Sequence, residues 1–411
     1  MVQRKMTVRV VLEGASSTVL VGAGAPVAVQ SMTNTPTEDV EATAAQAAEL
    51  ARAGSEIVRV TVNTTEAARA VPRIVERLQR QGLAVPVVGD FHFNGHKLLA
   101  EEPACARALS KFRINPGNTR TQEHFDSMIE AALAFGKPVR IGVNGGSVDM
   151  RLLEAMRLAN DKLAEPEPFA RVFERALVQS ALQSARRANE LGLGDEAIVL
   201  SAKVSSVASL VRVYRSLSEQ SACPLHLGLT EAGTGLKGEV ASAAGLSILL
   251  AEGIGDTVRV SVTPAPGQAR TQEVRIARTI LQSLGLRAFA PTVTSCPGCG
   301  RTASRLFEEL ACEMDAYLEE MTPVWSRTCA GFESMRVAVM GCVVNGPGES
   351  RSANIGISLP GAFETPNALV FEDGRPAGSI KGDARAIALA FKSRVNDYVL
   401  AHYAKDATKH V

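Results

Sequence analysis

The chain has 411 residues, 46% of them apolar and 21% charged, and its 44 basic side chains nearly balance 43 acidic ones. This length predicts two or three domains, or one large α/β barrel with a smaller domain. A formal net charge of +1 argues against a general nucleic-acid-binding protein, and the ordinary composition excludes a disordered or fibrous chain.

We expect no membrane segment, because the longest uncharged run, residues 14–37, contains Gly, Pro, Ser, Thr, Asn and Gln throughout. A secretory signal is not expected either, since Glu13 directly follows the short apolar run at residues 10–12. These features predict a cytoplasmic protein. In that compartment the seven cysteines fit metal ligation or core thiols better than a disulfide framework.

The first predicted element is a β-hairpin at residues 6–22, where apolar residues alternate on both sides of Gly14. We interpret it as a lid on the bottom of a barrel. Beyond it, a short apolar run, a loop and a helical segment recur up to about residue 290. The predicted strands are residues 27–32, 57–62, 85–91, 111–115, 139–144, 198–203, 225–230 and 257–262.

Amphipathic segments between these runs predict helices at residues 40–52, 66–80, 124–135, 207–218, 240–251 and 273–284. Eight βα units of this total length are typical of a (β/α)8 TIM barrel. An open doubly wound sheet is the alternative, but no G-x-G-x-x-G motif follows an early strand. Residues 147–190 exceed one helix and contain a Pro-bearing break at 165–168, which indicates an insertion followed by a covering helix.

Composition changes near Pro291, so we place a barrel domain at residues 1–290 and a second α/β domain at residues 291–411. In the second domain we expect a helix at residues 303–318, a strand at residues 336–340 and a closing helix at residues 384–402.

Five predicted strands carry a cation within the apolar run or at its C-terminal end: Arg59, Arg113, Arg140, Lys203 and Arg259. In a barrel the C-terminal strand ends form the active face, and alternate residues point into the lumen. Unpaired buried cations are costly, so their convergence predicts a bound polyanion such as a diphosphate. The alternative is that each cation pairs with an acid, for which Asp90 and Glu231 are available at strand ends.

Uncharged polar residues and histidines accompany these cations. Asn94, Asn115, Asn144 and Thr230 are expected to add donors at similar depth. Asp90, His92 and Asn94 are spaced by two and are therefore predicted to share one face. His226 is interpreted as a structural residue.

The second domain contains Ser295-Cys-Pro-Gly-Cys299 and, further on, Gly341-Cys-Val-Val-Asn-Gly-Pro-Gly-Glu349. A C-x-x-C pair with Cys342 as a third thiolate fits an iron–sulfur centre with one different ligand position better than a closed four-cysteine zinc site. Glu349 is our candidate for that position, and Cys312 and Cys329 are alternatives. A structural zinc site and a redox C-x-x-C pair stay open at this point.

The chain resembles the 4-hydroxy-3-methylbut-2-enyl diphosphate synthases of the methylerythritol phosphate pathway of isoprenoid biosynthesis. The shared motifs occur in order at residues 29–35 (VQSMTNT), 89–94 (GDFHFN), 112–117 (FRINPG), 229–233 (LTEAG), 295–299 (SCPGC) and 340–349 (MGCVVNGPGE). They extend over both predicted domains.

This resemblance implies a bacterial two-domain enzyme with a [4Fe–4S] cluster on Cys296, Cys299, Cys342 and Glu349. It implies that 2-C-methyl-D-erythritol 2,4-cyclodiphosphate binds at Arg59, Arg113, Arg140, Lys203 and Arg259, with Asn144, Ser261 and Thr230 nearby. The implied reaction is a two-electron reductive ring opening with loss of water.

Further expectations follow from the resemblance. His92 and Glu231 are candidates for proton handling, and flavodoxin or ferredoxin is the expected electron donor. A homodimer is implied, in which the cluster domain of one subunit closes over the barrel of the other. Cys312 and Cys329 match no motif of the family. A zinc-stabilised lyase or synthase and a binding protein without turnover are the competing classes.

Overall fold

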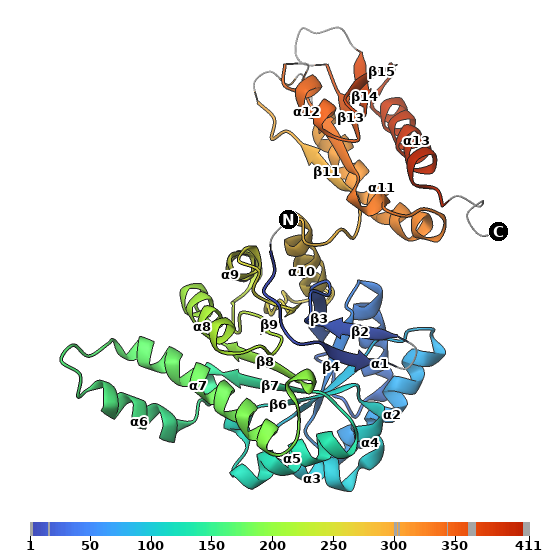
Figure 1. The fold of residues 1–411 in the computed structure, drawn as a ribbon. Helices are drawn as coiled ribbons and strands as arrows, with labels where there is room; N and C mark the ends of the chain where they lie inside the picture. The colour runs from blue at the N-terminus through green and yellow to red at the C-terminus, as the bar shows by residue number, and fades with distance from the viewer. Residues whose placement is uncertain are drawn as a thin grey trace. The chain divides into compact units, whose positions relative to one another are not determined.

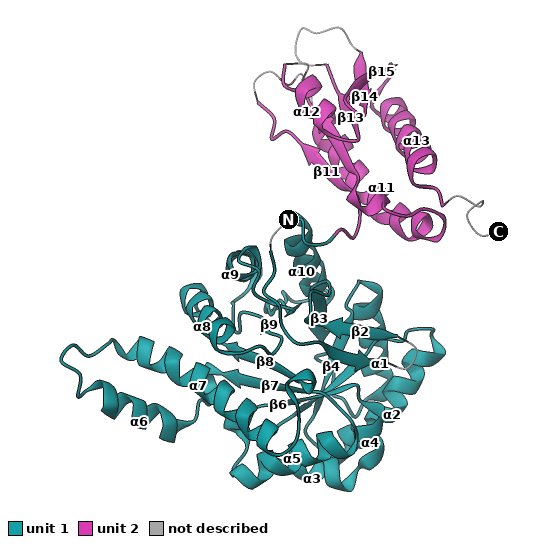
Figure 2. Cartoon of the chain, in the orientation of Figure 1, with its two compact units in different colours: residues 1–287 teal, residues 288–411 magenta. Residues whose placement is uncertain are grey.

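The computed structural model describes residues 3–14, 17–299, 302, 305–342, 344–360 and 367–405. The chain divides into two compact units, Met1–Arg287 and Ala288–Val411 (Figure 2). No helix among the described residues combines the length and the hydropathy that crossing a membrane requires.

The first unit is a barrel of eight parallel strands surrounded by helices (Figure 1). The strands are β3 (Ala28–Met32), β4 (Ile57–Val62), β5 (Val87–Phe91), β6 (Lys111–Ile114), β7 (Val139–Asn144), β8 (Ile198–Lys203), β9 (His226–Leu227) and β10 (Thr257–Val258). They lie in the order β8-β7-β6-β5-β4-β3-β10-β9. A parallel bridge between Leu200 and Leu225 brings β8 beside β9, so the barrel nearly closes and the predicted TIM barrel is confirmed.

The barrel helices are α1 (Val40–Arg52), α2 (Thr65–Arg80), α3 (Gly95–Glu101), α4 (Pro103–Ala108), α5 (Gln122–Ala134), α6 (Met150–Asn160), α7 (Phe169–Glu190), α8 (Val207–Gln220), α9 (Gly235–Ala251) and α10 (Gln272–Ser283). Side chains at N-cap positions fix several starts: Asp39, Thr64 and Thr121 each accept a hydrogen bond from a first-turn amide. The predicted insertion contains α6, which extends away from the barrel beside the first part of α7 (Figure 1). The rest of α7 is the predicted covering helix and packs on β7 and β8.

A two-stranded hairpin, β1 (Val10–Glu13) and β2 (Thr18–Val21), closes the lower end of the barrel as predicted. Its side chains Val10, Leu12 and Val21 pack in one cluster with strand residues near the N-terminal ends, among them Ile57 and Val88. All of these are fully buried. This apolar layer means that any polar ligand of the barrel must enter from the opposite end.

The last two strands are shorter than predicted, since runs 225–230 and 257–262 form ladders of only two residues each. The backbone stays hydrogen-bonded beyond them: the Arg259 amide donates to Leu227 O at 3.0 Å, and the Thr230 amide donates to Val204 O at 3.0 Å. The segments therefore continue along the barrel without regular pairing.

The second unit is a five-stranded sheet with helices α11 (Leu306–Thr328), α12 (Gly346–Ser352) and α13 (Ala384–Tyr403). Its strands lie in the order β11 (Thr292–Ser295), β12 (Arg336–Met340), β13 (Ile355–Ser358), β14 (Ala368–Glu372) and β15 (Arg375–Ile380). The first three are parallel and the last two antiparallel. The strand at 336–340 is as predicted, whereas the helix predicted at 303–318 continues to Thr328 because Trp325 is buried in the core of this unit.

Candidate active site

The five cations predicted from the strand runs are all buried in the barrel. Arg140 is the least exposed at 1% and Arg259 the most at 9%. The others are Arg59, Arg113 and Lys203. Electrostatic repulsion links them, since Arg259, Arg140, Arg59 and Arg113 all act on the ammonium of Lys203. The barrel therefore gathers five positive charges in one low-dielectric interior.

Burial is the main cause that lowers the pKa of both Arg140 and Lys203 well below the ordinary values. Repulsion by neighbouring guanidinium groups lowers these pKa values further. The electrostatic environment thus disfavours positive charge unless a counter-charge is present. A bound anion supplies such a counter-charge.

Two carboxylates supply part of the counter-charge. Asp90 accepts a hydrogen bond from Arg113 Nη1 at 2.7 Å and lies 3.4 Å from Arg59 Nε. Glu273 on α10 lies 3.9 Å from Arg259 and 3.2 Å from Arg270. The alternative that pairs each cation with Asp90 or Glu231 holds only for Asp90, because Glu231 is exposed and Glu273 is the acid beside Arg259.

Neutral groups orient the remaining guanidinium donors. Arg140 Nη1 donates to Ser201 Oγ at 2.7 Å, and Arg113 Nη2 donates to Gly142 O at 3.1 Å. Arg59 contacts the sulfur of Met32 through Nε at 3.2 Å and Nη2 at 2.8 Å. These contacts fix the cations in place before any ligand is bound.

Two glycines leave space for the cations. A Cβ on Gly142 would lie 2.9 Å from Arg113 Nε and 3.1 Å from Arg140 Nη1. A Cβ on Gly228 would lie 2.7 Å from Lys203 Nζ. Any larger residue at either position would displace a cation. Neither glycine was predicted to belong to the site.

The polar residues predicted around the cations lie near the C-terminal strand ends. Asn144, Thr230 and Ser261 are half-buried, and Asn144 is paired in register with Lys203. Asn115 is buried instead, and its Nδ2 donates to Ser147 Oγ at 2.8 Å. Its side chain therefore connects the end of β6 to the loop that follows β7. Glu231 has a left-handed φ of 53°, a conformation that costs a non-glycine residue roughly 1–2 kcal/mol.

His92 lies next to the Asp90–Arg113 pair, with Nε2 at 3.3 Å from Arg113 Nη1 and 3.9 Å from Asp90 Oδ1. Burial, together with repulsion by Arg113 and Arg59, lowers its pKa despite the attraction of Asp90. The imidazole is therefore neutral at neutral pH. The prediction that Asn94 shares this face is wrong, because Asn94 follows the end of β5 and donates to Asn63 O at 2.9 Å.

Sequence analysis missed a sixth buried cation, Lys111, at the first position of β6. It is fully buried and precedes Arg113 by two residues, so both face the lumen. His226 is also fully buried, with Nδ1 at 2.5 Å from Thr257 Oγ1, in line with its structural interpretation. Lys111 was not predicted because it precedes the apolar residues of its strand, whereas the predicted cations lie within an apolar run or at its C-terminal end.

In the second unit, two loops that carry cysteines follow adjacent parallel strands. β11 and β12 pair with Ser295 opposite Val339, so Cys296 lies opposite Met340 and Cys342 follows two residues later. The amide of Gly341 donates to Cys296 Sγ at 3.4 Å. A Cβ on Gly341 would lie 2.8 Å from the ring of Phe307, so a larger residue at this position would have to displace Phe307.

The remaining predicted ligands differ in exposure. Cys299 is exposed, Cys342 is buried, and Glu349 is exposed in the first turn of α12. Of the alternatives, Cys312 is exposed on α11 and Cys329 is buried where α11 ends. None of the seven cysteines forms a disulfide.

The donor set fits an iron–sulfur centre in chemistry. Three thiols come from adjacent strand ends, and a backbone N–H already donates to one sulfur, as is typical around cluster thiolates. In the described ranges, no three side chains of His, Cys, Asp or Glu are gathered as a ready-made ion site.

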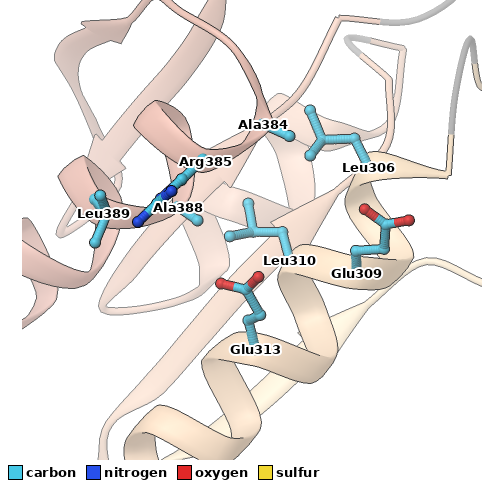
Figure 3. A pocket seen from close by; sticks show the side chains of 8 residues that line it. All are labelled: Leu306, Glu309, Leu310, Glu313, Ala384, Arg385, Ala388 and Leu389. Carbon is cyan, nitrogen blue, oxygen red and sulfur yellow. The ribbon is translucent and has the colours of Figure 1, made fainter.

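A groove of about 400 Å³ lies between α11 and α13 of the second unit (Figure 3). It combines apolar side chains (Leu306, Leu310 and Leu389) with charged ones (Glu309, Glu313 and Arg385). Two carboxylates against one guanidinium do not suit an anionic ligand. The cation-lined barrel is therefore the better candidate for a phosphorylated substrate.

Solved structures similar to this chain include two enzymes at low sequence identity. A dihydropteroate synthase of Xanthomonas albilineans is 16% identical with a TM-score of 0.42, and the match covers 68% of this chain and 98% of that one. A 3-dehydroquinate dehydratase of Geobacillus kaustophilus is 12% identical with a TM-score of 0.44, covering 68% and 99%. These similarities are too weak to bear on function.

A TIM barrel lined with cations, followed by an α/β unit with cysteine-bearing strand ends, defines a two-domain enzyme for an anionic substrate. Residues 14–278 match the family model "GcpE TIM-barrel domain", and residues 292–396 match "GcpE protein C-terminal domain". The chain therefore belongs to the GcpE family, the 4-hydroxy-3-methylbut-2-enyl diphosphate synthases. This family converts 2-C-methyl-D-erythritol 2,4-cyclodiphosphate to (E)-4-hydroxy-3-methylbut-2-enyl diphosphate.

Proposed function

We propose that the barrel unit binds the cyclic diphosphate of the family reaction through Arg59, Arg113, Arg140, Lys203 and Arg259. The observation that carries the proposal is the charge imbalance: among the described residues, Asp90 and Glu273 are the only buried carboxylates that contact these five buried cations. A diphosphate supplies two negative charges and oxygen acceptors that match guanidinium donors. Asn144, Thr230 and Ser261 are proposed as neutral contacts at the same end.

The reaction consumes two electrons and two protons, opens the ring at a carbon–oxygen bond to phosphate, and releases one water. As that bond breaks, negative charge develops on the leaving phosphate oxygen. Cations fixed in advance by Asp90, Ser201 and Gly142 stabilise this charge without reorganising during the step.

His92 and Glu231 are the proposed proton-handling residues of the barrel. His92, beside Arg113, can relay a proton from solvent to the substrate hydroxyl that leaves as water. Glu231 is exposed on the segment between β9 and α9. Its left-handed backbone conformation is strained for a residue other than glycine, and such strain often occurs at functional sites.

The second unit is proposed to carry a [4Fe–4S] cluster on Cys296, Cys299, Cys342 and Glu349. When bound, the cluster supplies one-electron transfers and a Lewis-acidic iron. The amide of Gly341 stabilises the Cys296 sulfur, and Glu349 offers the single oxygen donor of the set. Flavodoxin or ferredoxin is the proposed electron donor, and a homodimer is the proposed assembly, both as the family resemblance implies.

The substrate proposal is tested with Arg113→Ala. Loss of this guanidinium removes a direct phosphate donor and leaves Asp90 with Arg59 alone, so kcat/KM should fall at least about a hundredfold, equivalent to about 3 kcal/mol. Iron and sulfide content should be unchanged. Arg73→Ala, at an exposed position of α2, is the matched control and should keep full activity. Wild-type kinetics in Arg113→Ala would remove this residue from the substrate site.

A further inference from the structure

Lys111 is a cation that the proposed contacts with substrate do not use. Its side chain is fully buried, and within the described part of the chain its Nζ has no hydrogen-bond partner. Its partner in register on β5 is Val88, which belongs to the apolar cluster under the β1–β2 hairpin. Above it on the same face of β6 lies Arg113. A permanently charged ammonium in this position would be strongly destabilising.

The ionisable groups that face Lys111 are Arg140 on β7, Arg59 on β4 and His226 on β9. None of these is an acid, and the buried carboxylate of Asp90 already contacts Arg59 and Arg113. Burial first, and then repulsion by Arg140 and Arg59, lowers the pKa of Lys111 to about 7. In the ligand-free protein Lys111 is thus largely neutral at slightly alkaline pH.

We propose that Lys111 is a sixth cation of the anion site, which takes up a proton from solvent when the cyclic diphosphate binds and then stabilises the bound anion. The inference rests on the proposed substrate site. The reason is that Arg140 and Arg59, whose charges disfavour a proton on Lys111, are among the proposed phosphate contacts. An anion that neutralises them removes this repulsion and adds attraction of its own.

The proposal predicts how affinity depends on pH. The complex binds more protons than the free protein, so binding must weaken as pH rises through and above the pKa of free Lys111. In that range Kd should rise by up to about tenfold per pH unit. Each phosphorus of the cyclic diphosphate carries a single, strongly acidic hydroxyl. The ligand therefore does not titrate near neutral pH, and the proton must go to the protein.

The test is calorimetric titration of the anaerobically purified, full-length protein with 2-C-methyl-D-erythritol 2,4-cyclodiphosphate, without reductant so that no turnover occurs. Titrations at pH 8 in buffers of different ionisation enthalpy give the number of protons taken up. Lys111→Met removes the ionisable group with little change in volume, and Lys111→Arg replaces it with a permanent cation. His92, Lys203 and His226 are common to all three proteins, so differences between them report on Lys111.

We expect wild type to take up as much as about one proton more than either variant. Lys111→Arg should bind with an affinity that depends less on pH, and Lys111→Met should bind more weakly than wild type near pH 7. Equal proton uptake in wild type and in Lys111→Arg or Lys111→Met would overturn the inference while leaving the substrate site intact. Absence of binding to wild type would instead contradict the proposed substrate.

Discussion

Asp90 is the residue on which the geometry of the anion site depends most. It is the buried acid shared by Arg59 and Arg113, on the strands that flank β5. Burial alone would raise the pKa of Asp90, but the two guanidinium groups outweigh burial and hold the pKa below its ordinary value. Asp90 is therefore ionised at neutral pH and positions both cations for a ligand.

Asp90→Asn should lower the free energy of unfolding by about 3–5 kcal/mol at neutral pH, because it leaves two buried guanidinium groups without their counter-charge. A depressed pKa in the folded state means that this stabilisation is present above about pH 4 and is lost as pH falls further. Urea unfolding should therefore separate wild type from variant at pH 7 and bring them closer in strong acid. Equal stability at pH 7 would show that Asp90 is not a buried counter-ion.

At the scale of elements, neighbouring parallel strands and the segments that follow them assemble both candidate sites. In the barrel they gather cations from β4, β6, β7, β8 and the segment after β10, and in the second unit β11 and β12 carry the cysteines. Residues distant in sequence, such as Cys296 and Cys342, become neighbours because β11 and β12 pair in register. Chemistry at such strand ends can vary without disturbing the sheet below.

Cys296→Ser tests the strand-end cluster. The alcohol of serine is a poor soft-metal ligand, so the anaerobically purified variant should lose most of its iron and acid-labile sulfide, whereas wild type should contain about four of each per chain. Cys312→Ser is the matched control, since Cys312 is exposed on α11 away from the strand ends, and should keep the full complement. A full complement in Cys296→Ser would refute its ligand role. A single zinc in colourless wild type would favour a non-redox barrel enzyme.

The elements show how far sequence predicts this fold. Helix α1 has the bounds that periodicity gave, because Asp39 caps its start and its apolar face is continuous. The predicted strand at 225–230 is longer than the observed β9, because alternation in the sequence does not show that only two residues pair with the neighbouring strand. Strands β13 to β15 were not predicted at all: β13 is buried throughout and β15 is mostly exposed, so neither strand leaves an alternating pattern in the sequence.

The site was predictable only where charge interrupts an apolar run. Arg59, Arg113 and Arg140 stand out in this way, and all three are buried. Glu273 could not be found by the same means, because it lies on α10 and reaches Arg259 only through the fold. The role of Gly142 and Gly228 could not be predicted either, because the need for glycine depends on cations that approach these positions only in the folded barrel.

At the scale of the whole molecule, we propose that the two units divide the work of one reaction. In this proposal the first supplies a nearly closed, cation-lined barrel, and the second supplies three thiols with one carboxylate, Glu349. Neither set of groups suffices alone, because a diphosphate site has no source of electrons and a cluster site has no means of orienting the substrate. The family assignment of both units joins them in a single enzyme.

Anaerobic single-turnover conversion tests this account most directly. The purified full-length protein, reduced with dithionite, is mixed with 2-C-methyl-D-erythritol 2,4-cyclodiphosphate, and the products are identified by mass spectrometry. We predict (E)-4-hydroxy-3-methylbut-2-enyl diphosphate in proportion to the reducing equivalents supplied, and none without reductant. Recovery of unchanged cyclodiphosphate from fully reduced, cluster-loaded protein would contradict the account.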